Sequence, residues 1–428
     1  MPAPRLAQTH PLMPGATCGR RAHHIDVSGV PVRPDLRRAL LLGVLYLSFI
    51  SLGLPDTLLG VAWPEMRLSF GKSLEAGGIL LALTTVISVC ASLASGIVTA
   101  RRHTGVILAV CAALTASAML GYATAPSWTA LLLCTLLFGI GQGAVDTAVN
   151  AYMAKHYAAR HMQWVHACWG LGATAGPLIM STVFALDATW RTGYLCVAGI
   201  QASLTVVFFL SLPLWRNGGS SAPDARPTHA APPVPATPAG EAGARAAATA
   251  GVLFYLLYPG VEIVTGLWGA SYMVERLGAP VETAAGAITL FWGSLTAGRV
   301  GAGLAASRLG NAGIIRCGCA LAFLGILCAW SADGPGLFRI GAALIGLGLG
   351  PLYPSMMHDT PARVGAALAD RVIGFQVGAA LAGAMILPPL AGWLAGRVSL
   401  AVFCPVQLTF LTLVAIAHET SFRLSKRR

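Results

Sequence analysis

The chain has 428 residues, of which 56% are hydrophobic and only 10% are charged, whereas a soluble domain carries about 25% charged residues. With a mean hydropathy of +0.70, this composition excludes an ordinary soluble protein. The formal net charge of +12 could suit a nucleic-acid partner, but the charges fall between apolar segments and not on one soluble face. We therefore expect an integral membrane protein in contact with the lipid bilayer that binds no nucleic acid.

The first segment, residues 1–36, is polar and rich in proline. It lacks the apolar core of a signal peptide, so we expect a flexible cytoplasmic N-tail. A long apolar segment follows from Ala39, and a spanning helix needs about 20 mostly apolar residues. Twelve segments meet this condition, near 39–61, 76–99, 105–124, 127–152, 164–186, 193–214, 250–273, 284–305, 312–331, 336–357, 372–395 and 398–418. The sequence thus predicts an all-α membrane protein with twelve transmembrane helices in two six-helix halves.

The segment between the sixth and seventh spans is rich in Pro, Ala, Gly and Ser, and it shows no apolar periodicity. Such a composition is typical of a flexible linker. The predicted organisation is therefore an N-tail (1–36), an N-terminal six-helix half (37–214), a cytoplasmic linker (215–247), a C-terminal six-helix half (248–418) and a cytoplasmic C-tail (419–428).

Most of the 28 Lys and Arg residues fall on one side of this topology, in the two tails, the linker and the loops that follow even-numbered spans. Cytoplasmic loops carry such an excess, so both termini are predicted to be cytoplasmic. The preference for Arg over Lys, together with many Ala and Gly residues, suggests a GC-rich bacterial genome. We expect a multi-pass protein of the bacterial inner (plasma) membrane, acting as a monomer.

The two halves repeat each other at an offset of 207 residues. Gly139, Gly141 and Gly143 match Gly346, Gly348 and Gly350, and Gly176 matches Gly383. Glycines at four-residue spacing allow helices to approach closely, and we assign these glycines to packing. Parallel repeats of this kind place a substrate cavity at their interface, near the middle of the membrane.

Three acids lie inside predicted spans: Asp56 in helix 1, Asp146 in helix 4 and Glu262 in helix 7. A charge at the bilayer centre costs at least about 2.5–3.5 kcal/mol, so these side chains should face a cavity. Asp56 and Glu262 are 206 residues apart and occupy nearly equivalent places in the repeat. Intramembrane acids of this kind mark proton pathways in transporters, and we assign proton coupling to all three. The alternative for each is a structural carboxyl satisfied by a neighbouring hydroxyl or Arg, and Glu262 has binding of a substrate hydroxyl as a further alternative.

On helix 4, Gln142, Asp146 and Asn150 follow each other at intervals of four and form one polar stripe. A stripe of this kind facing lipid would be untenable, so we expect it to line a cavity between the halves. We find no nucleophile–base pair, metal cluster or phosphate loop, and the ten cysteines have neither disulfide nor zinc spacing. The sequence therefore predicts no enzyme, no metal and no cofactor.

The segment "SGIVTARRHTG" between helices 2 and 3 resembles the signature loop of the major facilitator superfamily. In that loop a Gly is followed by an Asp–Arg pair; here Gly96 and Arg101 are present, but Ala100 replaces the Asp. The second copy keeps Arg308 and Gly310, with Ser307 in place of the Asp. The resemblance implies a transporter fold over nearly the whole chain and makes the two arginines, Arg101 and Arg308, gating or structural residues.

A narrower resemblance lies in "LPDTLLGVAWP" of helix 1 and "DTAVNAY" of helix 4. These segments look like the fucose permease branch of the superfamily, the fucose–galactose–glucose:proton symporters. In that branch an acid in helix 1 and another in helix 4 carry proton coupling and sugar recognition. Asp56 and Asp146 match these positions, although Asp146 stands where the branch has Glu, and Ala151 replaces the Pro of its helix 4 motif.

A sugar site needs hydrogen-bonding groups and aromatic faces. The candidates for substrate contact are Gln142, Asn150, Trp268, Tyr272, Tyr353 and Gln376. Tyr353 is the repeat partner of Asp146, and each aromatic has packing or interfacial anchoring as a rival role. His166 is assigned to gating or structure, and Arg299 is expected to anchor the cytoplasmic end of helix 8.

The function predicted from these residues is proton-coupled uptake of a monosaccharide or similar small polar solute by alternating access, with that solute and protons as partners. Two alternatives share the fold. An exporter of drugs or metabolites would favour a larger, aromatic-lined pocket, and a sodium-coupled sugar transporter would use the acids as cation ligands. A membrane enzyme or a non-transporting sensor is a further class, for which the sequence carries no chemistry.

Overall fold

The computed structural model describes residues 34–99, 103–157, 159–215 and 238–426, and the regular elements in this part of the chain are all helices. The N-terminal elements are α1 (Pro34–Asp56), α2 (Leu58–Ser69), α3 (Ala76–Thr99), α4 (Thr104–Thr124), α5 (Trp128–His156), α6 (Ala159–Ala185), α7 (Trp190–Leu210) and α8 (Leu212–Trp215). The C-terminal elements are α9 (Pro238–Leu257), α10 (Pro259–Leu277), α11 (Val281–Trp330), α12 (Pro335–Leu349), α13 (Leu352–Val364), α14 (Ala366–Arg397), the 3-10 turn η1 (Leu400–Val402) and α15 (Phe403–Lys426).

Eleven helical stretches in the described residues are long and apolar enough to cross a membrane. They match eleven of the twelve predicted spans, because α1 with α2, α9 with α10, and α12 with α13 each form one span interrupted by a break. The twelfth, 284–305, lies in the first arm of α11, where Arg299 and several Gly, Ser and Thr residues lower the hydropathy. Gly310, at φ 63° and ψ 164°, separates this arm from the second.

Some helices begin or end outside the ranges predicted for them. α9 begins at Pro238, inside the range predicted as linker, because the segment that follows is rich in alanine, the strongest helix former. α1 begins at Pro34 and α15 continues to Lys426, so both reach into the predicted tails. The rest of the N-tail and most of the linker lie outside the described residues.

The two halves are built alike, as the glycine repeat predicts. A Cβ on Gly143 of α5 would overlap the carbonyl oxygen of Ser88 in α3, and a Cβ on Gly350 would overlap that of Leu295 in α11. Both pairs are related by the same offset of 207 residues. The glycines therefore allow close helix packing within each half, as the sequence analysis assigned.

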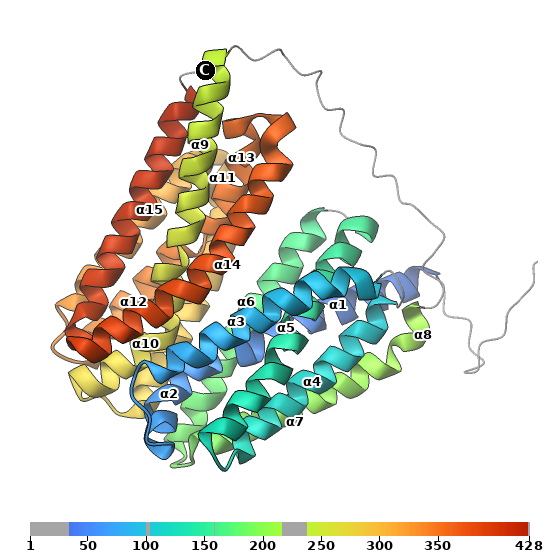
Figure 1. Cartoon of the computed structure of the whole chain (residues 1–428), viewed down its shortest axis with the longest axis vertical. Helices are drawn as coiled ribbons and strands as arrows, with labels where there is room; N and C mark the ends of the chain where they lie inside the picture. The colour runs from blue at the N-terminus through green and yellow to red at the C-terminus, as the bar shows by residue number, and fades with distance from the viewer. Residues whose placement is uncertain (1–33, 100–102, 158, 216–237, 427–428) are drawn as a thin grey trace, which may run out of the picture.

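The halves touch at one end and diverge at the other (Figure 1). At the first end, here called the closed end, α2 lies against α10, and Arg67 forms an ion pair with Glu275 at 2.7 Å. Gly60 packs so tightly on the backbone of Gly266 that a Cβ would overlap its carbonyl oxygen. At the opposite end, the open end, α8 and the start of α9 lie far apart in Figure 1.

Candidate functional site

The first span breaks between α1 and α2 and places a carboxylate at the break. Pro55 cannot donate a backbone hydrogen bond, and α1 ends at Asp56. Thr57 connects the two helices, and its hydroxyl donates to the carbonyl of Ala173 in α6 at 2.8 Å. The side chain of Asp56 thus projects beside the start of α2, where the helix dipole favours negative charge.

Both carboxylate oxygens of Asp56 accept hydrogen bonds. Gln142 Nε2 in α5 donates to Oδ1 at 2.8 Å, and Trp169 Nε1 in α6 donates to Oδ2 at 3.2 Å. Gln142 also donates to the carbonyl of Leu52 at 3.1 Å. Asp56 is itself exposed, so the carboxylate is held by two donors and still open to a solute or to water.

From Trp169 the contacts cross into the other half. The guanidinium of Arg299 in α11 lies 5.6 Å from the centre of a Trp169 ring. Arg299 also forms an ion pair with Glu262 Oε1 at 3.9 Å and donates to the carbonyl of Gly350 at 3.3 Å. Asp56, Trp169, Arg299 and Glu262 therefore form a continuous polar chain between the halves, here called the inter-half chain.

The two acids of this chain differ in their position within the repeat. A Cβ on Gly176 would meet Leu54 and Thr57, and a Cβ on Gly383 would meet Leu256 and Pro259. Helix 1 therefore matches helix 7 at an offset of 202 residues, which pairs Asp56 with Tyr258. The prediction that Asp56 and Glu262 occupy nearly equivalent places in the repeat is therefore wrong, because Glu262 lies one helical turn beyond Tyr258.

The polar stripe of α5 is partly engaged by this chain. Gln142 is buried against Asp56, whereas Asp146 is exposed one turn further toward the open end. Asn150 Nδ2 donates to Asp146 Oδ1 at 3.0 Å within the helix, and Asn150 Oδ1 is buried without a partner. The stripe therefore leaves both a carboxylate and an amide oxygen with unused hydrogen-bonding capacity.

The remaining candidates for substrate contact lie elsewhere. Trp268 is 2% exposed and donates to the carbonyl of Pro388 at 2.8 Å, and Tyr272 stacks on Phe338 and Phe403. Both side chains are buried by packing within the C-terminal half, so neither is free to contact a solute.

Gln376 is also buried, and its Oε1 accepts from Thr360 at 3.0 Å. Tyr353, half-buried, packs edge-to-face on Tyr255 at 4.7 Å and also contacts Tyr258, whose hydroxyl donates to Leu349 O. Of these two candidates, only Tyr353 keeps a partly open position.

The gating candidates are also spread out. His166 lies edge-to-face on Phe49 at 5.2 Å, within the N-terminal half. Arg308 is exposed just before the turn at Gly310. Arg101 lies outside the described residues. Arg299, expected at a helix end, is instead the link between Glu262 and Trp169.

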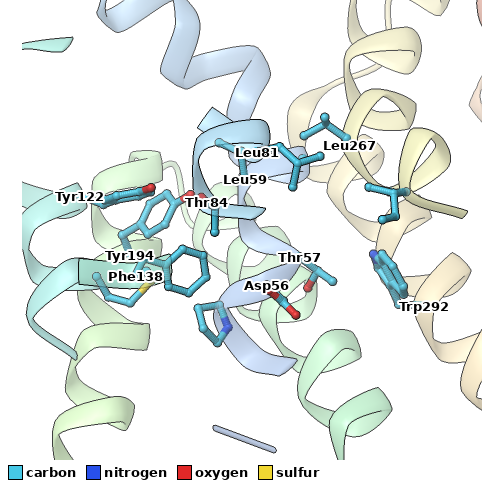
Figure 2. Close-up of a pocket in the computed structure, with 15 residues that line it drawn as sticks. Asp56, Thr57, Leu59, Leu81, Thr84, Tyr122, Phe138, Tyr194, Leu267 and Trp292 are labelled. Carbon is cyan, nitrogen blue, oxygen red and sulfur yellow. The ribbon is translucent and has the colours of Figure 1, made fainter. Parts of the chain in front are cut away.

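A cavity of about 60 Å³ extends from Asp56 toward the closed end. Figure 2 shows Tyr122, Tyr194 and Phe138 on one side, Trp292 on the other, and Asp56 with Thr57 between them. Neither a place for Trp292 in this site nor the pairing of Trp169 with Asp56 is predicted from the sequence. Nothing in their spacing signals either role, because both depend on contacts between helices distant in the chain.

Among the described residues, no group of three or more His, Cys, Asp and Glu side chains could hold a metal ion. The fold and site thus define a class: a two-halved helical membrane protein with a polar chain between its halves. The sequence model of the Major Facilitator Superfamily matches residues 45–379. The chain belongs to this superfamily of membrane transporters, whose members carry small-molecule substrates, often with protons, and are generally not enzymes.

Solved structures of the same fold are similar over most of the chain. A D-xylose–proton symporter has a TM-score of 0.68 at 13% identity, covering 91% of this chain and 98% of its own. The nucleoside transporter NupG has a TM-score of 0.68 at 14% identity, covering 92% and 100%. A bacterial homolog of the human lysosomal transporter Spinster gives 0.67 at 12%, covering 92% and 98%. A search of curated proteins finds no sequence match.

Proposed function

We propose that this protein is a secondary active transporter that couples an inward proton gradient to the uptake of a small uncharged hydroxylated solute. The observation that carries the proposal is the inter-half chain, in which Asp56 is joined through Trp169 and Arg299 to Glu262. One acid lies in each half, and the chain joins them across the surface on which the halves would rock.

Asp56 is the proton site of this proposal. As a carboxylate it accepts from Gln142 and Trp169, and hydrogen bonds to a charged group contribute about 1.5–3 kcal/mol each. Protonation removes the charge and weakens both bonds, which frees Trp169 and loosens its contact with Arg299. A proton on Asp56 thereby acts on the same contact that holds the two halves together.

The solute would lie beside Asp56, with Asp146 and Asn150 toward the open end. The resemblance to the fucose permease branch and the fold neighbours described as carrying D-xylose and nucleosides support a hydroxylated solute. With both termini cytoplasmic, the open end faces the cytoplasm, and the described contacts correspond to a state that would receive or release solute there.

The experiment is uptake into proteoliposomes of labelled L-fucose, D-galactose, D-xylose and uridine, with and without an inward proton gradient. Wild type is compared with Asp56→Asn and Asp146→Asn, and with Asp187→Asn, an exposed acid between α6 and α7, as the matched control. We expect Asp56→Asn to lose gradient-driven accumulation while retaining exchange of solute in the absence of a gradient. Accumulation equal to wild type in that variant contradicts the assignment of Asp56.

Export of an amphipathic solute is the second candidate, because apolar and aromatic side chains dominate the lining of the cavity. Reversing the proton gradient separates the two. Accumulation driven only by protons moving against the solute favours the exporter. Repeating uptake after sodium is replaced by potassium tests sodium coupling, and an unchanged rate excludes it.

A further inference from the structure

The cavity behind Asp56 has a lining unlike that expected for a bare sugar. Eight helices contribute to it: α1, α2, α3, α4, α5 and α7 from the N-terminal half, and α10 and α11 from the C-terminal half. Its walls are mainly apolar or aromatic, including Leu59, Leu81, Met119, Phe138 and Leu267. A solute that enters this space must therefore present an apolar face.

One polar group on this lining has no partner within the described part of the protein. Trp292 is 5% exposed, and its Nε1 is buried without a hydrogen-bond partner. Its nitrogen edge packs beside Gly266, which also lines the cavity, and Figure 2 shows the indole directed into the cavity. A buried donor left unpaired is destabilising, so a ligand acceptor at this point would be bound favourably.

The other hydroxyl groups near the site are largely engaged within the protein. Thr57 donates to Ala173, Thr84 donates to Leu80 at 2.9 Å, and Tyr122 pairs with Thr135 at 2.7 Å. A bare monosaccharide carries hydroxyl groups around its whole ring, and this lining would leave several of them unpaired. A flat ring with one acceptor on its edge would leave none.

The position of Trp292 also connects this cavity to the inter-half chain. Its ring lies edge-to-face on Trp169, with the ring centres 5.9 Å apart. Trp169 in turn donates to Asp56. A ring placed against Trp292 would therefore lie next to the carboxylate that receives the hydroxylated part of the same molecule.

We propose, resting on the function proposed above, that the solute is a hydroxylated molecule bearing a flat aromatic or heteroaromatic ring. The ring enters the cavity between Trp292 and the side formed by Tyr122 and Phe138, and an acceptor on its edge receives the Trp292 N–H. The hydroxylated part binds at Asp56. Trp292 is thereby the residue that determines preference for ring-bearing solutes over bare monosaccharides.

The test compares two matched pairs of probes on the purified full-length protein: uridine with D-ribose, and phenyl β-D-galactoside with D-galactose. Binding is measured by thermal stabilisation in detergent and by competition for uptake. We expect each ring-bearing probe to bind at least about 10-fold more tightly than its bare sugar. Equal or tighter binding of the bare sugars overturns the proposal.

Trp292→Phe then separates the N–H from the ring. Only uridine has acceptors on its ring edge, so this variant should weaken uridine about 10-fold and leave phenyl β-D-galactoside nearly unchanged. Trp330→Phe, on the exposed end of the same helix, is the matched control. Unchanged affinity for uridine, or an equal loss of affinity for both probes, overturns the role of the N–H. The ranking of the probes on the wild-type protein does not depend on whether the variant folds.

The readouts distinguish this proposal from the one on which it rests. If ring-bearing probes bind more tightly than bare sugars but a proton gradient has no effect on uptake, the assignment of the cavity to a ring is supported and proton coupling is wrong. If a gradient drives uptake of bare sugars only, proton coupling is supported and the ring preference is wrong.

Discussion

The guanidinium of Arg299 lies over the indole of Trp169, and this contact joins the two halves between the exposed Asp56 and the buried Glu262. A cation over an aromatic face contributes about 0.5–2 kcal/mol, depending on how dry the site is. That is small enough to break in each transport cycle. The contact links the two acids, because Trp169 donates a hydrogen bond to Asp56 and Arg299 forms an ion pair with Glu262.

Trp169→Phe should separate the two functions of this indole. The ring under Arg299 remains, whereas the N–H that donates to Asp56 Oδ2 is lost. We expect gradient-driven uptake to fall about 10-fold, from the loss of one hydrogen bond to a charged group, with little change in melting temperature. Trp164→Phe, an exposed tryptophan on the same helix, is the control. Equal uptake by both variants would show that Asp56 does not depend on this bond.

Arg299→Gln should destabilise the protein. It leaves Glu262, 8% exposed and with Oε2 already unpaired, without its cation. Removing one partner of a buried ion pair costs about 3–5 kcal/mol, so the melting temperature in detergent should fall by several degrees. The double variant Arg299→Gln/Glu262→Gln should recover most of that loss. A double variant as unstable as the single one would mean that Arg299 acts through Trp169 or Gly350 and not through Glu262.

Gly60→Ala tests closure of the α2–α10 contact. An added Cβ would overlap the carbonyl oxygen of Gly266, so the halves cannot approach as closely at this end. We expect faster hydrogen exchange in α2 and α10 and a loss of most transport. Gly43→Ala, in the preceding helix α1, is the matched control, because a Cβ at Gly43 would have no atom within 4 Å. Similar behaviour of both variants would place the effect in helix propensity and not in closure.

Charge reversal tests the ion pair at the closed end. Arg67 and Glu275 are partly exposed, at 20% and 29% of their side-chain surface, and such pairs contribute about 0.2–1 kcal/mol. Arg67→Glu should therefore shift the balance between closed and separated forms at this end by up to about fivefold. The combined variant Arg67→Glu/Glu275→Arg should restore it, as measured by hydrogen exchange in α2 and α10. Without restoration, the pair has no specific role in closure.

The spans could be predicted because length and hydropathy alone decide whether a helix can cross a membrane, and eleven of the twelve are found directly. The glycine pattern also predicted real contacts, such as Gly143 on Ser88. The pairing of Asp56 with Glu262 failed, because five more residues separate Leu256 from Leu295 than separate Leu54 from Ser88. A single offset cannot describe both helix pairs.

The site itself was only partly predictable. Asp56 and Gln142 can be identified from the sequence as polar residues in apolar spans, but their hydrogen bond joins residues 86 positions apart on different helices. Tryptophans carry no such signal in a membrane protein, since core and cavity positions look alike in sequence. The sequence predicts substrate contact for Trp268, which is buried in the core, and not for Trp292, which lines the cavity.

The turn at Gly310 has a mechanical meaning. The first arm of α11 packs on α12 through Gly346 and Gly350, and the second arm packs on the same helix through Gly318 and Gly325. Gly310 joins the arms directly, and both arms are packed on the same helix, so we expect them to move together. The second arm is tied to α15 by Arg316 and Glu419. We therefore expect a displacement of Arg299 in α11 to move α12 and α15 with it, so that the C-terminal half rotates as one rigid body.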